Sequence, residues 1–300
     1  MEDIRIMSVS ILIPTYNYDC TELARDIQEQ AELAGMDYEI IIGDDGSTDG
    51  RIVSRLVDFC SHPHCKLLRQ KRNVGRAAIR NILGHEASGD NLLFMDSDAE
   101  MAVSNFLSSY INAIEDHEVV SGFIAHPSTP PAADMLLRYE YEKHAEKRFS
   151  AHHLNRIAHP PFSTFCFMIR KTLFSRFSFD ESYTGYGYED VQYGKVLRDH
   201  GYRVFYINVP LRHNGMEKNY RFIEKTETAL HALREHKAEL MDEVHLLRTI
   251  HKLRRVGMEG LVRRMLGKLL PRMRRNLCSD HARLRWFSWY KLGYYLNHCQ

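Results

Sequence analysis

The sequence predicts an α/β protein built on an open, mostly parallel β-sheet that is flanked by helices. Short apolar runs, each long enough for one buried strand, alternate with segments whose apolar residues recur at helical spacing. Three of these runs end in polar clusters, at residues 14–17, 44–49 and 96–98. Because such sheets bind ligands beyond the carboxyl ends of their strands, we expect the three clusters to converge on one edge.

The first hundred residues carry the clearest alternation. Four short apolar runs bounded by turn-forming residues predict strands at 9–14, 38–44, 65–70 and 91–95. The segments between them predict helices at 21–33, 51–60 and 74–87. We expect Thr21 to cap the first helix and Gly89 to close the third.

The alternation of strands and helices continues with a helix at 104–116 and a strand at 119–126, and then it ends. A loop rich in proline follows. The sequence then predicts a charged helix at 135–149 and a buried strand at 162–170. A helix beginning near Glu189 (189–200) and another strand (203–209) come next. From Lys225 onward the pattern is helical. We therefore expect a catalytic domain over 1–224, with halves of about 1–100 and 101–224, and a helical extension over 225–300.

Composition and charge limit the classes of protein to which the chain can belong. The six cysteines form no CxxC pair, which favours a reducing compartment over a disulfide framework or a zinc site. The opening MEDIRIMSVS is not typical of a secretory leader, and no apolar run approaches the ~18–20 residues that span a bilayer. We therefore expect a cytoplasmic protein, soluble or peripheral on the inner face of a membrane.

The C-terminal region is strongly basic. Residues 248–300 carry thirteen Lys/Arg and two acidic residues, a net charge of +11, whereas the remainder carries −10. One apolar stripe flanked by arginines runs through this region: Leu247, Ile250, Leu253, Leu261, Met265 and Leu269. Both tryptophans follow it. The pattern fits an interfacial anchor for an anionic membrane over 245–300, or a helix that packs on the catalytic body with a solvated basic face.

Two aspartates one residue apart follow the fourth predicted strand. Asp96 and Asp98 form a hard-oxygen site suited to Mn²⁺ or Mg²⁺, but they could also simply open a loop and cap the next helix. A phosphatase nucleophile is disfavoured, because Ala99 and Glu100 follow where such enzymes have a small hydroxyl residue. Neither GxGxxG nor a P-loop follows the early strands, which argues against dinucleotide and P-loop sites.

Five motifs in order resemble those of family 2 glycosyltransferases with the A-type (GT-A) nucleotide-sugar fold. They are SILIPTYN, EIIIGDDGSTDG, RNVGRAAIRN, LLFMDSDAEM and GYGYEDVQYGKVLRDHGYRV, and they cover roughly residues 8–215. The resemblance implies a nucleotide-sugar site formed by Pro14, Tyr16, Asn17, Asp44, Asp45, Arg80, Asp96 and Ser97. In it, Asp45 would accept from uracil N3–H and Asp96 would contact ribose or the donor sugar.

The resemblance also implies which residues bind the metal and which residue acts as the general base. Asp98 would hold the metal that bridges the two phosphates, and His213 in LRHNG resembles a further ligand, although a surface histidine is the alternative. Asp190 would be the general base that takes the acceptor proton, while the charge of Glu189 would raise its proton affinity. The alternative for this pair is simply that acids begin a helix.

The leading interpretation is a metal-dependent, inverting glycosyltransferase. It would move a hexose or N-acetylhexosamine from a UDP-sugar to a saccharide acceptor, which the basic tail suggests is lipid-linked. The alternative is an inactive transferase-like module whose tail binds a membrane or nucleic acid; the leading interpretation expects no nucleic acid partner. A nucleotidyltransferase is disfavoured, because PTYNYDC lacks a glycine-rich basic loop.

Overall fold

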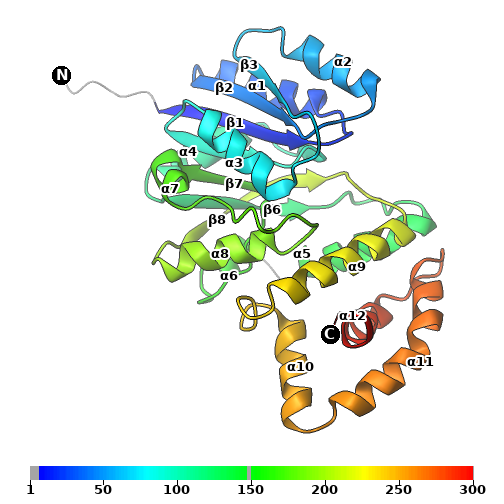
Figure 1. Cartoon of the computed structure of the whole chain (residues 1–300). Helices are drawn as coiled ribbons and strands as arrows, with labels where there is room; N and C mark the ends of the chain where they lie inside the picture. Colours follow the sequence, from blue (N-terminus) through cyan, green and yellow to red (C-terminus); the bar gives the residue numbers. More distant parts are fainter. Residues whose placement is uncertain (1–6, 147–149, 300) are drawn as a thin grey trace. The chain divides into compact units, whose positions relative to one another are not determined.

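The computed structural model describes residues 7–146 and 150–299, which form two compact units (Figure 1). The described part of the first unit comprises residues 7–125, 150–184 and 193–215. The second comprises 126–146, 185–192 and 216–299. Most of the opening segment and the last three residues of the helix expected over 135–149 lie outside the described residues.

The first unit is built on one eight-stranded sheet with the strand order β3-β2-β1-β4-β7-β6-β8-β5. The strands are β1 (Ser8–Thr15), β2 (Asp37–Asp44), β3 (Cys65–Arg69), β4 (Asn91–Met95), β5 (Ala99–Met101), β6 (Val119–Ala125), β7 (Cys166–Arg170) and β8 (Val204–His213). β1 pairs in parallel with β2 and β4, β2 with β3, and β6 with β8. β7 is antiparallel to β4 and β6, and β5 is antiparallel to β8. The mixed, mostly parallel sheet expected from the sequence is confirmed.

β1 lies inside the sheet and nevertheless contains a proline. Its pairing with β4 ends where Leu12 faces Phe94, whereas its pairing with β2 continues to Thr15 and Asp44. Pro14 therefore lies beyond the residues of β1 that form hydrogen bonds with β4. The absence of a backbone N–H at Pro14 costs little stability at that position. The strand runs one residue beyond the predicted end.

Helices cover both faces of the sheet. The helices of one face are α1 (Thr21–Leu33), α2 (Gly50–Phe59) and α4 (Phe106–Ile114), and those of the other are α3 (Arg76–Glu86), α6 (Ala151–Leu154), α7 (Lys171–Arg176) and α8 (Glu189–Asp199). In β4, Leu93 and Met95 point to the first face while Leu92 and Phe94 point to the second. Burial on both faces explains why these strands read as continuous apolar runs.

Two local predictions are wrong, and one alternative, the capping of a helix by the DxD, is excluded. Thr21 is the first residue of α1 and not its cap; the Asp19 carboxylate accepts from the Thr21 backbone N–H at 3.1 Å and from its hydroxyl at 2.8 Å. Helix α3 ends at Glu86, before Gly89. The DxD does not lead into a helix, because the short strand β5 follows it. The sequence analysis also missed α6 and α7, which are only four and six residues long.

The second unit is helical. Its elements are η1 (Ala133–Met135), α5 (Leu136–Glu146), α9 (Asn219–Glu235), α10 (His245–Arg255), α11 (Glu259–Leu277), α12 (Leu284–His298) and the first turn of α8. Asn219, the first residue of α9, links α5 with the turn after α11: its Oδ1 accepts from the Leu137 backbone N–H at 2.9 Å, and its Nδ2 donates to the Ser279 carbonyl at 2.9 Å. Phe287 of α12 packs between Phe222 and Tyr141, at centroid distances of 5.3 and 5.2 Å.

The predicted apolar stripe of the tail does not form one continuous face. Gly257, with a φ of +69°, separates α10 from α11. Leu247 and Ile250 of α10 are each 1% exposed, whereas Leu261 and Met265 of α11 are 56% and 57% exposed. Two of the six stripe residues are therefore in the core, Leu253 is half-buried, and the three on α11 are exposed. Among the described helices, none is both long and apolar enough to cross a membrane.

Candidate functional site

The ends of β1 and β2 are joined by one asparagine. Asn17 has a φ of +50°, and its Oδ1 accepts from the backbone N–H groups of Thr48 at 2.8 Å and Asp49 at 3.1 Å. Its own backbone N–H donates to Ser47 Oγ at 2.7 Å. The short polar side chain of asparagine tolerates this left-handed backbone and satisfies the loop. The first two polar clusters therefore form one connected surface.

Asp44 and Asp45 hold the loops around them. The fully buried Asp44 accepts from Arg69 Nε at 3.1 Å and from the Ser47 backbone N–H at 2.8 Å. Asp45 accepts from the backbone N–H groups of Val74 at 2.7 Å and Gly75 at 3.1 Å. Burial raises the pKa of the Asp45 carboxyl, against the lowering effect of these two donors. A carboxylate has about four lone-pair sites, so Asp45 keeps acceptor capacity for a ligand.

The first aspartate of the DxD binds two arginines of α3. Asp96 Oδ1 lies 2.6 Å from an Arg80 guanidinium nitrogen, and its Oδ2 lies 2.8 Å from one of Arg76. The Arg80 side chain is 1% exposed, while that of Arg76 is 37% exposed. Arg80, which we expected near the nucleotide, therefore positions Asp96. Arg76 was missed, although a spacing of four residues places both arginines on one helix face.

Asp98, the second aspartate of the DxD, contacts His213 at the end of β8. The antiparallel pairing of β5 with β8 aligns Ala99 with His213, and this places His213 Nε2 at 3.1 Å from Asp98 Oδ2. The imidazole is buried and the carboxylate is 28% exposed. A Cβ on Gly215 would lie 2.0 Å from Asp98 Oδ2, so only glycine fits beside this carboxylate. The structure thus brings together the two residues that we expected to bind a metal.

The remaining expected residues of this edge are accessible. Tyr16 is 48% exposed directly after β1, while Pro14 and Ser97 are half-buried. Tyr18 was not predicted; burial and then the negative charge of Asp98 raise the pKa of its phenol. The three polar clusters therefore lie at the carboxyl ends of β1, β2 and β4, as the sequence analysis predicts.

Glu189 and Asp190 begin α8 and belong to the second unit. Glu189 is 3% exposed and Asp190 is half-buried, so Asp190 is the more accessible carboxylate. The residue before them, Tyr188, has a φ of +72°, and Gly187 has a φ of +100°. A Cβ on Gly187 would lie 2.9 Å from Cβ of Ala229 in α9. The turn that carries the two acids is therefore strained and tightly packed.

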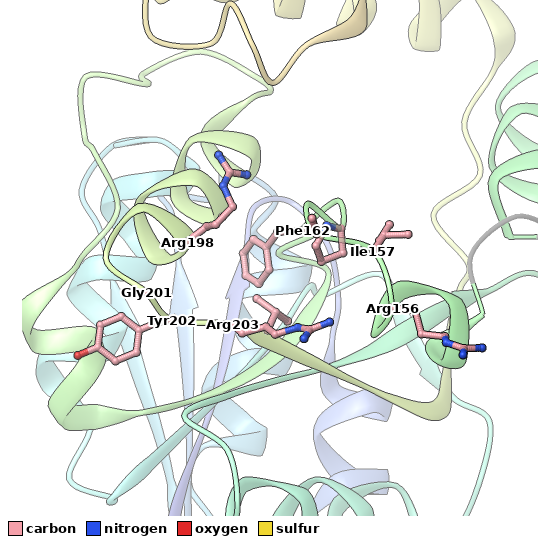
Figure 2. A pocket seen from close by; sticks show the side chains of 11 residues that line it. Arg156, Ile157, Phe162, Arg198, Gly201, Tyr202 and Arg203 are labelled. Atoms are coloured by element: carbon pink, nitrogen blue, oxygen red, sulfur yellow. The ribbon is translucent and has the colours of Figure 1, made fainter.

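A cavity lies at the other edge of the sheet, where β8 begins. It has a volume of about 320 Å³ and is lined by the end of α8, the entry to β8 and residues 156–162. Figure 2 shows Phe162 between Arg198 of α8 and Arg203, which precedes β8. None of the residues that the sequence analysis assigned to a site lines this cavity.

Comparison with known proteins places this geometry in a family. The model of glycosyl transferase family 2 matches residues 10–177, more than half of the chain. An uncharacterized glycosyltransferase of Haemophilus influenzae is 33% identical over 116 residues, which cover 38% of this chain and 45% of that protein. The undecaprenyl-phosphate 4-deoxy-4-formamido-L-arabinose transferase of an Enterobacter species is 34% identical over 120 residues, covering 38% and 36%. The chain thus spans less than half the length of these two relatives.

Solved structures share the fold at low identity. The mannosyltransferase PcManGT from Pyrobaculum calidifontis, in complex with GDP-Man and Mn²⁺, superposes with a TM-score of 0.55 at 16% identity, covering 96% of this chain and 84% of that one. GalNAc-T7 with UDP, GalNAc and Mn²⁺ superposes with a TM-score of 0.53 at 17% identity, covering 72% and 44%. These likenesses confirm the GT-A-type architecture. The family match over more than half of its length shows that this chain belongs to glycosyl transferase family 2, a family of transferase enzymes.

Proposed function

We propose that the protein transfers a hexose or N-acetylhexosamine from a UDP-sugar to a saccharide acceptor, with inversion at the anomeric carbon. The observation that carries this proposal is the pairing of Asp98 with His213 at the same sheet edge as Asp45 and Asp96. In open α/β sheets that edge is where ligands bind. The family match supports sugar transfer as the chemistry.

The Asp98–His213 pair fits a divalent cation. The separation of 3.1 Å between its two donor atoms is close to that of neighbouring ligands around an octahedral ion, about 3 Å for metal–ligand distances of about 2.1 Å. A carboxylate oxygen with an imidazole nitrogen suits Mn²⁺ better than Mg²⁺, which prefers oxygen ligands alone. When bound, such an ion supplies charge neutralisation for the leaving diphosphate.

The donor would be held by side chains of the first unit. Tyr16 and Pro14 would line the base pocket together with Asn17 and Asp44, and Asp45 would accept from uracil N3–H. Asp96, oriented by its two arginines, would accept from hydroxyls of the ribose or the donor sugar, beside Ser97. A carboxylate fixed by two guanidinium groups needs little reorganisation when the donor binds.

Asp190 would serve as the general base and Glu189 as its neighbour. The acceptor hydroxyl oxygen attacks the anomeric carbon and gives its proton to the Asp190 carboxylate. The bond from that carbon to the diphosphate oxygen breaks, and its electron pair leaves with UDP. Asp190 is chosen over Glu189 because Glu189 is almost fully buried. One displacement without an enzyme nucleophile inverts the configuration.

The acceptor is proposed to be lipid-linked. The Enterobacter relative is named for undecaprenyl phosphate, and the basic region 245–300 of this chain suits an anionic membrane surface. We accordingly propose a cytoplasmic enzyme that is peripheral on the inner face of a membrane. In this proposal residues 1–224 form the catalytic domain and 225–300 the membrane-proximal extension.

The test is UDP release from a panel of UDP-sugars, with GDP-sugars as competitors, in the presence and absence of Mn²⁺. Asp98→Ala and Asp190→Asn should each lower the rate at least ~100-fold. Asp190→Asn should keep the affinity for UDP, measured by calorimetry. The matched control is Asp199→Asn at the exposed end of the same helix.

Each result distinguishes one part of the proposal. Full activity in Asp190→Asn would remove the base assignment, and Mn²⁺-independent activity would remove the metal assignment. UDP binding without transfer from any donor would favour the inactive binding module instead.

A further inference from the structure

Exposed apolar side chains gather on one part of the second unit. Twelve large hydrophobic residues are exposed in the described chain, and six of them lie between residues 256 and 289. These six are Val256, Met258, Leu261, Met265, Leu269 and Trp289, with exposed fractions of 46–66%. A group of this kind is uncommon on a soluble surface unless something covers it.

The exposed apolar stripe of α11 is separate from the face by which this helix packs. Leu261, Met265 and Leu269 are spaced by four residues and so lie along one side. The helix packs through a different set of buried residues, Leu266, Leu270, Met273 and Leu277. The buried residues of α11 therefore already supply the apolar face by which this helix packs in the unit. The exposed stripe is not needed for that packing.

An apolar groove between α11 and α12 extends this surface. It has a volume of about 470 Å³ and is lined by Leu266, Leu269, Arg272, Met273, Trp286 and Trp289. The two helices approach closely, since a Cβ on Gly293 would lie 2.9 Å from Cβ of Leu266. Both tryptophans of the chain therefore line a groove between two firmly packed helices.

The charges around the stripe are basic. α11 carries six Lys/Arg and one acid, Glu259, which binds Arg254 with an N–O distance of 3.0 Å. Arg263, Arg264, Lys268 and Arg272 are exposed, and within the part of the chain that the structure describes they have no carboxylate at ion-pair distance. At helical spacing, Lys268 and Arg272 fall beside the stripe formed by Leu261, Met265 and Leu269.

We infer that α11, α12 and the turn before α11 form a face that docks on an anionic lipid bilayer. The exposed apolar side chains enter the boundary between headgroups and acyl chains, the basic side chains contact lipid phosphates, and the α11–α12 groove takes up an acyl chain. Exposed aliphatic side chains have no favourable partner on a nucleic acid backbone, which disfavours that polyanion. This inference rests on the membrane association in the proposed function. It keeps the α11 half of the predicted stripe and replaces the α10 half with Val256, Met258 and Trp289.

The experiment uses the full chain and two kinds of vesicle, phosphatidylcholine alone and phosphatidylcholine mixed with phosphatidylglycerol. Co-sedimentation gives the affinity, and quenching of the two tryptophans by brominated lipid reports insertion. The triple variant Leu261→Ser, Met265→Ser, Leu269→Ser should bind anionic vesicles at least ~tenfold more weakly. Leu33→Ser, at an exposed apolar residue of the first unit, is the matched control and should bind like the wild type.

A charge variant tests whether the basic side chains contribute to vesicle binding. Lys268→Gln with Arg272→Gln should weaken binding to anionic vesicles by about 25-fold, since each basic residue near such a surface is worth about fivefold. Lys71→Gln, exposed in the first unit, is its control. Unchanged binding in either test variant, equal binding to both kinds of vesicle, or absence of tryptophan quenching would overturn the inference.

UDP release by the same variants, without vesicles, separates this inference from the proposed function. Loss of vesicle binding with intact UDP release confirms that the docking face lies outside the chemistry. A wild-type chain that releases UDP but binds no vesicles overturns the docking face alone. A chain that binds anionic vesicles through this face but transfers no sugar overturns the proposed function alone.

Discussion

Replacing Asp96 by asparagine should destabilise the first unit strongly. The carboxylate neutralises two guanidinium groups, at 2.6 Å from Arg80 and 2.8 Å from Arg76. Asparagine has nearly the same shape and can still accept a hydrogen bond, but it carries no charge. Because the Arg80 side chain is only 1% exposed, water cannot replace the lost counter-charge.

The exposure of the two arginines decides how large a loss of stability we expect. Removing one partner of a buried ion pair costs about 3–5 kcal/mol in the free energy of unfolding, whereas an exposed pair contributes about 0–1 kcal/mol. Arg80 belongs to the first case and Arg76, at 37% exposure, to the second. We therefore expect a loss of about 3–5 kcal/mol for Asp96→Asn and at most about 1 kcal/mol for Arg76→Gln. Adding Arg80→Met to Asp96→Asn should restore most of the loss, because it removes the buried guanidinium charge that has lost its partner.

Urea unfolding followed by far-UV circular dichroism measures these differences for the three variants and the wild type. The reasoning is refuted if Asp96→Asn lies within about 1 kcal/mol of the wild type, or if the double variant is less stable than Asp96→Asn. UDP affinity measured on the same samples shows whether the loss of the carboxylate also affects the donor.

Three further predictions concern the site. Gly215→Ala puts a Cβ 2.0 Å from Asp98 Oδ2, and should raise the Mn²⁺ concentration that half-activates UDP release about tenfold or more; an unchanged Mn²⁺ titration would contradict it. Gly187→Ala forces an alanine to a φ of +100° against Ala229, and should lower kcat while UDP affinity stays within about twofold; a parallel loss of UDP binding would speak against a role in placing Asp190. Chelation by EDTA should abolish UDP release and added Mn²⁺ should restore it, whereas activity that survives chelation would be inconsistent with a metal requirement.

The strands β1, β2, β4 and β7 of the first unit were predictable because they are buried on both faces. A strand in that position must be apolar throughout, so runs such as the one before Asp96 stand out from the helices around them. β5 escaped prediction because it is three residues long and forms only by pairing with β8, more than a hundred residues later in the chain. Short elements of this kind depend on tertiary contacts that no local pattern shows.

The position of the candidate site at a strand edge was predictable, but only part of its contacts was. Sequence spacing places Asp96 and Asp98 at a strand end, and the family resemblance pairs Asp98 with His213, but neither reveals that Asp96 binds two arginines of α3. The tail shows the same limit. An apolar period that continues through Gly257 looks like one helix face, and only packing distinguishes the buried Leu247 from the exposed Met265.

The pairing of β5 with β8 also has a consequence for synthesis on the ribosome. Asp98 and His213 are 115 residues apart, and at about 5–20 residues per second their partner strands are made roughly 6–23 seconds apart. During that interval β1, β2, β3 and β4 have all been made, whereas β5 still awaits the strand with which it pairs. A nascent or truncated chain that ends before β8 can therefore present the Asp96 half of the DxD with its arginines, but not the Asp98–His213 pair.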